Sequence, residues 1–139
     1  CSGPGGMFTT VGRMFSIGSE PSDSLKKSWE EVIAAQEKLA GMLQPGMDPQ
    51  IIFAQYNEYL AGKGYVQETG MFAYGQGCDH IERPSIQPGE TMKLAQDMCL
   101  AVNTNLVSAE RTVYGADSYL LKANGPQKMH KTPSTVFRT

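Results

Sequence analysis

The sequence lacks the features that mark membrane-spanning and nucleic-acid-binding proteins. None of its apolar stretches approaches the roughly 20 residues that a membrane-spanning helix needs, and no signal-peptide pattern is present. The net charge is −2, and no dense run of Lys and Arg occurs. Nucleic acids and anionic membrane surfaces are bound by concentrated basic faces, so we expect neither as a partner.

Cysteine is also scarce. The three cysteines, Cys1, Cys78 and Cys99, are odd in number, and their spacing fits neither a zinc site nor a disulfide framework. Unpaired thiols are typical of reducing compartments. The sequence therefore predicts reduced thiols in a cytoplasmic protein.

The composition is that of an ordinary globular domain. Hydrophobic residues make up 40% of the 139 positions and charged residues 19%. A chain of this length can bury a real core, because single domains commonly run to roughly 100–150 residues. No internal repeat, linker or low-complexity tract divides it, which indicates one unit over residues 1–139.

Two helices are predicted in the first half of the chain. The first follows Pro21, with Ser22 or Asp23 as its N-cap, and ends at residues 45–46 (PG). The second begins at residues 48–49 (DP), a capping residue followed by proline in the first turn. The stripe that the first helix would bury, with one polar member, consists of Leu25, Trp29, Val32, Gln36, Leu39 and Leu43.

Strands are predicted on both sides of the helices. Residues 7–17 read as an N-terminal strand that ends at Gly18. Short strands are predicted at residues 99–102, 112–114 and 118–121. The order of one strand, two helices and several strands indicates an α+β fold with a largely antiparallel sheet.

Several segments, taken in order, match the motifs of one enzyme family. They are residues 5–15 (GGMFTTVGRMF), 43–47 (LQPGM), 64–65 (GY) with 74–84 (YGQGCDHIERP), 94–102 (LAQDMCLAV), 117–125 (DSYLLKANG) and 130–133 (HKTP). Together they resemble the pita-bread, metallopeptidase-like family of prolidases, aminopeptidase P, methionine aminopeptidases and creatinase. The resemblance covers essentially the whole chain. It implies the C-terminal half of a pita-bread domain, a curved, mostly antiparallel sheet with two helices packed on one face.

The resemblance also locates the metal ligands of the family, which this sequence has replaced. Members bind two metal ions through two Asp, one His and two Glu side chains. The second Asp position is Thr10, the His position is Tyr74, the first Glu position is Asn103 and the second is Ala116. The first Asp would lie upstream of Cys1. These replacements lack the charge and basicity of the ligands, so we expect no metal and no other cofactor.

The same resemblance implies a partial domain over residues 1–139. Cutting a sheet leaves unpaired strand edges, which are costly unless the missing part remains bound. We therefore expect a separate chain from the same precursor to carry the N-terminal half, and a homodimer of that heterodimer. The expected substrate is a small molecule or a peptide.

Cys1 is the leading candidate nucleophile. Self-cleavage can expose a cysteine whose free α-amino group then acts as general base for its own side chain. Such a thiol would attack an amide or ester carbonyl, with Tyr74, Asn103 or the backbone N–H groups of residues 2–6 (Pro4 excepted) stabilising the oxyanion. The alternative explanations of Cys1 are a cloning remnant and adventitious proteolysis.

Two further residues are candidates for proton transfer. His80 and Glu82 lie in the segment that resembles the family's "HExP" motif. A lone histidine is more often a structural hydrogen-bond partner, and Glu82 could equally pair with Arg83 or with a backbone group. Candidates for substrate contact, each weighed against packing or surface exposure, are Thr10, Asn103, Arg111 and Asp117.

Three functions are compatible with these residues. The leading hypothesis is a self-processed, metal-independent hydrolase or acyltransferase that uses Cys1 on an amide of a small metabolite or peptide. The second is a creatinase-like, metal-free hydrolase or lyase in which Cys1 is incidental and His80 or Glu82 transfers protons. The third is a non-catalytic module that binds peptides or proteins.

Overall fold

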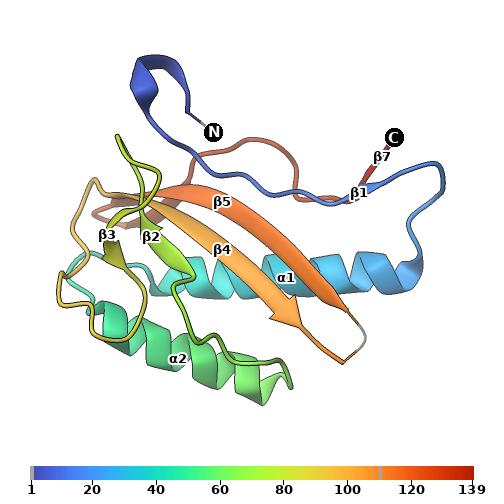
Figure 1. Ribbon diagram of the computed structural model, residues 1–139, viewed down its shortest axis with the longest axis horizontal. Coiled ribbons are helices and arrows are strands. Elements are labelled where there is room, and N and C mark those ends of the chain that lie inside the picture. Colours follow the sequence, from blue (N-terminus) through green and yellow to red (C-terminus); the bar gives the residue numbers. More distant parts are fainter. Residues whose placement is uncertain (1, 110) are drawn as a thin grey trace.

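The fold is a five-stranded antiparallel sheet with two helices on one of its faces (Figure 1). The computed structural model describes residues 2–109 and 111–139. In spatial order β3-β2-β4-β5-β6, the strands are β2 (Ala73–Gly75), β3 (Glu82–Ser85), β4 (Cys99–Val107), β5 (Thr112–Lys122) and β6 (Gly125–Lys128). The α+β class and the curved, mostly antiparallel architecture predicted from the sequence are confirmed.

The two helices begin at the capping residues that the sequence indicates. In α1 (Asp23–Met42), the Ser22 hydroxyl accepts a hydrogen bond from the Leu25 N–H at 3.3 Å. In α2 (Pro49–Gly62), the Asp48 carboxylate accepts one from the Gln50 N–H at 2.9 Å. Each cap satisfies a backbone donor that would otherwise have no partner in the first turn.

The core lies between α1, α2 and one face of the sheet. Trp29, Val32 and Leu39 on α1 are buried against Leu100 and Val102 of β4. The polar member of the predicted stripe, Gln36, is also buried, and its side-chain amide donates to the Val102 carbonyl at 3.4 Å. Burial of this amide is therefore accompanied by a hydrogen bond, as buried polar groups require.

The long hairpin of β4 and β5 differs from the prediction in extent. The expected strands at residues 112–114 and 118–121 form one continuous strand, paired with β4 from Cys99↔Leu120 to Val107↔Thr112. Gly115, at the predicted break, lies inside this strand. A Cβ atom at Gly115 would be 2.8 Å from Val32 Cγ1, so glycine here permits close packing of α1 on the sheet rather than ending a strand.

The N-terminal segment departs most from the prediction. A continuous strand over residues 7–17 was expected, but the structure has a short 3-10 turn, η1 (Pro4–Gly6), and only the two-residue strand β1 (Phe15–Ser16). Pairing with the sheet is limited to one isolated bridge, in which the Gly12 N–H donates to the Ala116 carbonyl at 2.8 Å, and the Arg13 guanidinium donates to the same carbonyl at 3.1 Å. The expected strand was therefore wrong in extent.

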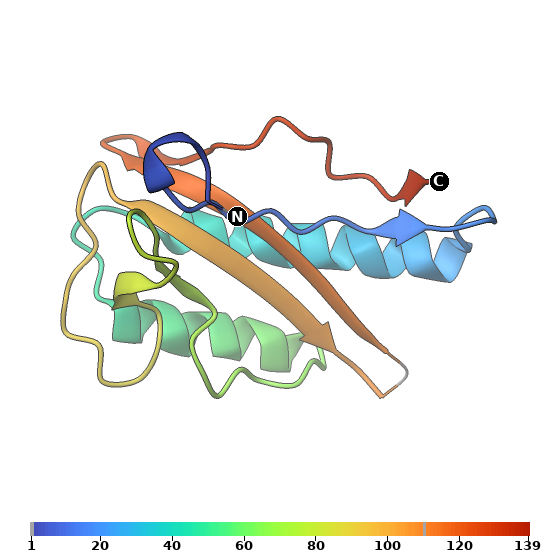
Figure 2. The same cartoon turned by 45° about the horizontal axis from the view of Figure 1, so that its top comes forward.

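The C-terminal tail runs beside this segment over β5 (Figure 2). β1 pairs in parallel with β7 (Phe137–Arg138), and the rings of Phe15 and Phe137 stack at 5.2 Å. Residues from the two ends of the sequence thus lie together at the edge of the sheet. Among the described helices, none is long and apolar enough to cross a membrane.

Candidate functional site

The face of the sheet that points away from the helices collects most of the predicted site residues. Successive strand residues point to opposite faces, and Gly115 faces α1, so Ala116 faces the other way. Asn103 of β4 lies directly opposite Ala116 of β5, and Tyr74 of β2 lies opposite Ala101, two residues along β4 from Asn103 and therefore on the same face. Three of the four positions that correspond to family metal ligands therefore share one small area.

Thr10, the fourth of these positions, joins them from the N-terminal segment. Its backbone N–H donates to the Ser118 hydroxyl at 2.9 Å, and its own hydroxyl accepts a hydrogen bond from the Gln76 amide at 2.8 Å. Ser118 lies across β4 from Tyr74, since both pair with Ala101. The structure therefore brings Thr10 to the area that holds Tyr74 and Ser118.

A tyrosine that was not predicted from the sequence adjoins this area on β5, two residues from Ala116. The Tyr114 hydroxyl donates to the Asn103 side-chain oxygen at 2.6 Å. Its ring lies over Gly12, where a Cβ atom would come within 3.1 Å of the ring. Partial burial, and then the neighbouring phenol of Tyr74, raise the pKa of Tyr114, so the phenol is neutral at physiological pH.

This donor set does not fit the metal centre that the family resemblance implies. Hydroxyl, phenol and amide groups stand where Asp, His and Glu would bind, and the Tyr114 side chain lies among them. Across residues 2–109 and 111–139, no group of three His, Cys, Asp or Glu side chains could hold a metal ion. Hard divalent metals prefer charged oxygen ligands, which this area does not offer.

His80 and Glu82 lie at the rim of the same area, His80 on the turn between β2 and β3 and Glu82 at the first position of β3. The His80 ring contacts the rings of Phe8 and Tyr74, with centroid distances of 5.8 and 6.1 Å. The Glu82 carboxylate accepts a hydrogen bond from the Asp79 N–H at 2.7 Å. His80 is thus the titratable side chain adjoining Tyr74, while Glu82 takes part in the local turn.

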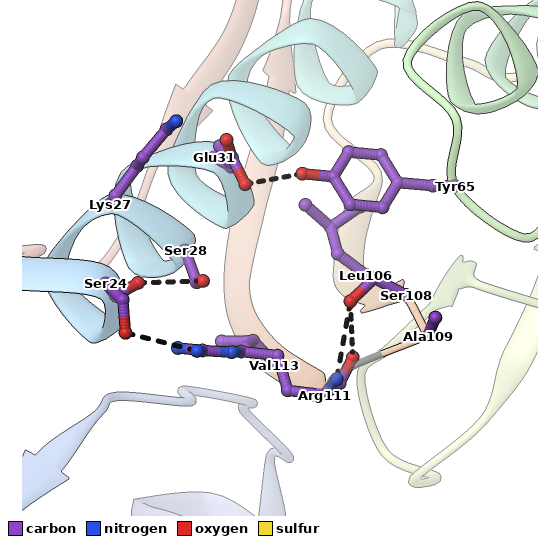
Figure 3. Close-up of a pocket in the computed structure, with 10 residues that line it drawn as sticks. All are labelled: Ser24, Lys27, Ser28, Glu31, Tyr65, Leu106, Ser108, Ala109, Arg111 and Val113. Atoms are coloured by element: carbon purple, nitrogen blue, oxygen red, sulfur yellow. Dashed lines mark hydrogen bonds between the residues drawn. The ribbon is translucent and has the colours of Figure 1, made fainter.

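Arg111 lies in a different place from the other candidates. It precedes β5 by one residue, and five residues separate it from Ala116, or roughly 17 Å along an extended strand at about 3.4 Å per residue. It lines a pocket of about 450 Å³ at the turn that joins β4 to β5, and its guanidinium donates to the Ser24 hydroxyl at 3.1 Å (Figure 3). On the far side of the pocket, the Tyr65 hydroxyl donates to the Glu31 carboxylate at 2.5 Å. The structure does not bring Arg111 to the face that holds Asn103.

Asp117 is the centre of a second, charged cluster at the edge of β5. Its carboxylate is fully buried and accepts contacts from three side chains. These are Arg13 at 3.0 Å, Lys128 at 2.7 Å and His130 Nδ1 at 3.0 Å. A buried carboxylate needs such compensation, because desolvation strongly disfavours an unpaired charge.

Hydroxyl groups extend this cluster to the face that holds Asn103. His130 Nε2 lies 2.9 Å from the Thr9 hydroxyl, which in turn lies 3.2 Å from the Ser118 hydroxyl. Ser118 also donates to the Gln76 side-chain oxygen at 3.2 Å. Thr9 and His130 were not among the residues predicted from the sequence, although His130 is one of only two histidines in the chain.

Cys1, the leading candidate nucleophile, lies outside the described residues. The nearby backbone that was expected to contribute oxyanion donors is described from Ser2 onward, and its Gly3 N–H donates to the Met7 carbonyl at 2.7 Å. The hypothesis for Cys1 therefore stays a prediction from the sequence.

Comparison with known proteins identifies the family to which this fold and its motifs belong. The model of metallopeptidase family M24 matches residues 2–123. The chain belongs to metallopeptidase family M24. Family membership confirms the resemblance stated from the motifs, including the match to the C-terminal half of the catalytic domain.

Individual M24 relatives show how much of the fold is shared. An uncharacterised peptidase of Bacillus subtilis (strain 168), YqhT, is 25% identical over 134 residues, which cover 95% of this chain and 38% of the relative. The Xaa-Pro dipeptidase from Bacillus anthracis superposes with a TM-score of 0.80 at 23% identity, covering 96% of this chain and 38% of the other. The X-Pro aminopeptidase from Thermotoga maritima MSB8 gives 0.78 at 24% identity, covering 93% and 36%. The chain thus spans well under half the length of these proteins.

Proposed function

We propose that this chain forms the substrate-facing part of a metal-independent M24 hydrolase that acts on an amide bond of a small metabolite or peptide. The observation that supports the proposal is that Tyr74 and Asn103, two positions where the family binds metal, share the face away from the helices with Tyr114. The family has kept the architecture of a peptidase site in this chain while the chemistry of the ligands has changed.

Neutral polar side chains can still bind an amide. The Asn103 amide N–H₂ can donate to a substrate carbonyl while its oxygen accepts from Tyr114. The Tyr74 hydroxyl can donate to the same group or to the oxyanion that forms from it. His80, in contact with the Tyr74 ring, supplies a titratable group for proton transfer at the rim.

The metal-independent part of the proposal is tested by metal analysis together with turnover. The purified protein, grown with Mn, Co, Fe and Zn supplied, should hold well under one metal ion per chain by mass spectrometry of the metals. Turnover of a dipeptide panel that includes Xaa-Pro substrates should be unchanged by a chelator. Stoichiometric metal, or activity lost to the chelator and restored by one metal, contradicts the proposal.

The substrate-facing residues are tested with variants and a matched control. Asn103→Ala and Tyr74→Phe should each reduce kcat/KM by about 10- to 1,000-fold if they contact the reacting group. Asn124→Ala, in the exposed turn between β5 and β6, is the control and should turn over as the wild type does. Wild-type turnover by Asn103→Ala and Tyr74→Phe, as by the control, would rule out this face as the substrate site.

Two expectations from the sequence remain within this proposal. A nucleophilic Cys1 would make Cys1→Ala inactive, and a self-processed precursor would stay intact in that variant, as intact mass would show. Association with a separate N-terminal chain, and dimerisation of that pair, are measured by light scattering of the purified protein.

A non-catalytic module that binds peptides is the second candidate. It is favoured by the mutual hydrogen bond of Asn103 and Tyr114, because side chains that satisfy one another are suited to a static recognition surface. Peptide binding measured by calorimetry, without turnover of any panel member, would select this function over hydrolysis.

A further inference from the structure

We propose that Thr9, His130 and Asp117 form a nucleophile, base and orienting acid, and that the Thr9 hydroxyl takes up the acyl group of an amide or ester substrate. The inference deepens the proposed metal-independent hydrolase function and rests on it, with Thr9 in place of Cys1 as the nucleophile. It draws on three residues from three separate segments, none of which is a metal-ligand position of the family.

The geometry is that of a hydrogen-bonded relay. Thr9 Oγ1 lies 2.9 Å from His130 Nε2, and His130 Nδ1 lies 3.0 Å from Asp117 Oδ1. Both distances fall in the range in which a nucleophile meets a base and the base meets its orienting group. The relay therefore uses both nitrogens of one imidazole ring.

The acid of the relay is buried and its hydroxyl is partly exposed to solvent, as such a relay needs. The Asp117 side chain is 0% exposed and the His130 side chain 19% exposed. Thr9 is also partly exposed. The carboxylate is thus shielded from water, while the hydroxyl at the other end remains within reach of a substrate.

Arg13 and Lys128 hold the carboxylate in place. Arg13 contacts both Asp117 oxygens, at 3.0 Å and 3.2 Å, and Lys128 contacts Oδ2 at 2.7 Å. With its position fixed, Asp117 selects the tautomer of His130 that carries the proton on Nδ1. Nε2 then presents its lone pair to the Thr9 hydroxyl.

The location joins the relay to the proposed substrate face. Asp117 and Ser118 are neighbours in β5, so their side chains point to opposite faces of the sheet. His130 lies at the strand edge and reaches Asp117 on one side and Thr9 on the other. Thr9 is 3.2 Å from Ser118, which lies opposite Tyr74 across β4.

The reaction needs only substrate and water. Thr9 Oγ1 attacks the carbonyl carbon and forms a C–O bond, while its proton passes to His130 Nε2 and the carbonyl electrons move to oxygen. Collapse of this intermediate breaks the C–N or C–O bond of the substrate, and the Nε2 proton goes to the leaving group. Water, deprotonated by His130, then releases the acid and restores the Thr9 hydroxyl.

A fluorophosphonate probe tests the relay without requiring the natural substrate. Attack by Thr9 forms an O–P bond and expels fluoride, and the hydroxyl proton leaves through His130. We expect one adduct per chain, located at Thr9 by peptide mass mapping. No adduct, or an adduct at Ser118 or Cys1 instead, overturns the proposal.

Variants separate chemistry from a purely structural role. Thr9→Val should abolish labelling and Thr9→Ser should retain it, while His130→Gln should slow labelling at least about 100-fold. Thr112→Val, an exposed threonine on β5, is the control and should label as the wild type does. Unchanged labelling in Thr9→Val or His130→Gln overturns the relay, as does loss of labelling in His80→Gln with His130→Gln unaffected.

Folding and the parent proposal are checked separately. Only variants with wild-type circular dichroism at the assay temperature are scored, and the Thr9→Ser and Thr9→Val pair decides the outcome if His130→Gln does not fold. Chelator-sensitive turnover would contradict the metal-independent function while leaving the adduct at Thr9 intact. Absence of the adduct with chelator-resistant turnover would contradict the relay alone.

Discussion

The two faces of the central sheet are built from the same strands but held in different ways. Toward the helices, Leu100 and Val102 of β4 are buried among apolar side chains of α1. On the other face, Asn103 and Ser118 are joined through hydrogen bonds to the N-terminal segment and to β5. The first face depends on apolar area and packing, which are non-directional, and the second on directional contacts in which each group has a named partner.

The charged edge of β5 shows the difference most strongly. Asp117→Asn removes the charge that Arg13 and Lys128 share, and Arg13 is only 5% exposed. Breaking a buried pair leaves an uncompensated charge, so we expect a loss of about 3–5 kcal/mol in the free energy of unfolding. Urea unfolding of the purified protein measures it.

The control for this change is a carboxylate of the same type at the surface. Asp97 pairs with Lys122 at 2.8 Å but is 60% exposed. Asp97→Asn should cost less than about 1 kcal/mol, since exposed pairs are screened by water. Equal losses for the two variants would contradict the importance assigned to the buried cluster.

The apolar face should respond to loss of volume. Leu39 is fully buried between α1 and the sheet, and Leu39→Ala removes apolar contacts and leaves a cavity. The expected loss in unfolding free energy is about 2–5 kcal/mol. Leu25→Ala, nearer the start of α1 and only partly buried, should cost less, and the reverse order would place the core elsewhere.

Low pH should destabilise the protein through Glu90, a carboxylate in the loop that follows β3. Glu90 is buried and accepts hydrogen bonds from Arg83, at 2.5 Å, and from the N–H groups of Thr91 and Met92, each at 2.8 Å. The Arg83 hydrogen bond, followed by these backbone donors, holds the pKa of Glu90 well below its usual range. Because the pKa of Glu90 is lower in the folded than in the unfolded protein, its ionised form stabilises the fold at pH values above the unfolded pKa. This contribution is lost as the pH falls through the acid range.

The effect of acid is isolated by comparison with Glu90→Gln. This variant should be about 1–3 kcal/mol less stable than the wild type at pH 7, because a charged acceptor is lost. The difference should shrink between about pH 4 and pH 2, as measured by urea midpoints across that range. A difference that stays constant with pH would show that Glu90 acts through packing alone.

The smallest effect on stability is expected on the face that holds Asn103. Tyr114→Phe removes the 2.6 Å hydrogen bond to Asn103 and nothing else, at a cost of about 0.5–1.5 kcal/mol by urea unfolding. Because Asn103 loses its partner and can reorient, turnover or peptide binding should change by more than stability does. A larger effect on stability than on function would make this hydrogen bond structural.

Local signals predicted the helices well. The caps at Ser22 and Asp48 and the turn at residues 45–46 depend on neighbouring backbone groups, and the structure places each helix boundary within a few residues of them. The fold class followed from the order of elements. These features are encoded within a few residues of where they act.

Features that depend on distant partners were predicted less well. Gly115 suggested a break between two strands, because nothing nearby shows that α1 packs against it. The contact of His130 with Thr9 joins residues 121 positions apart, and no periodicity links them. Motif order brought Tyr74, Asn103 and Thr10 together, but only the three-dimensional structure shows Tyr114 among them and Arg111 at the far end of the hairpin.

The absent side chain at Gly115 has a mechanical consequence. With no atom beyond Cα at this point, Val32 and Trp29 of α1 reach the β5 backbone directly, so helix and hairpin share one fixed contact. Ala116 beside it pairs with Gly12 along the edge of β5, where a Cβ atom at Gly12 would come within 2.8 Å of the Ala116 nitrogen. Two adjacent residues of β5 are therefore held by different parts of the chain: α1 packs over the face of the strand at Gly115, and the N-terminal segment pairs along the edge of the strand at Ala116.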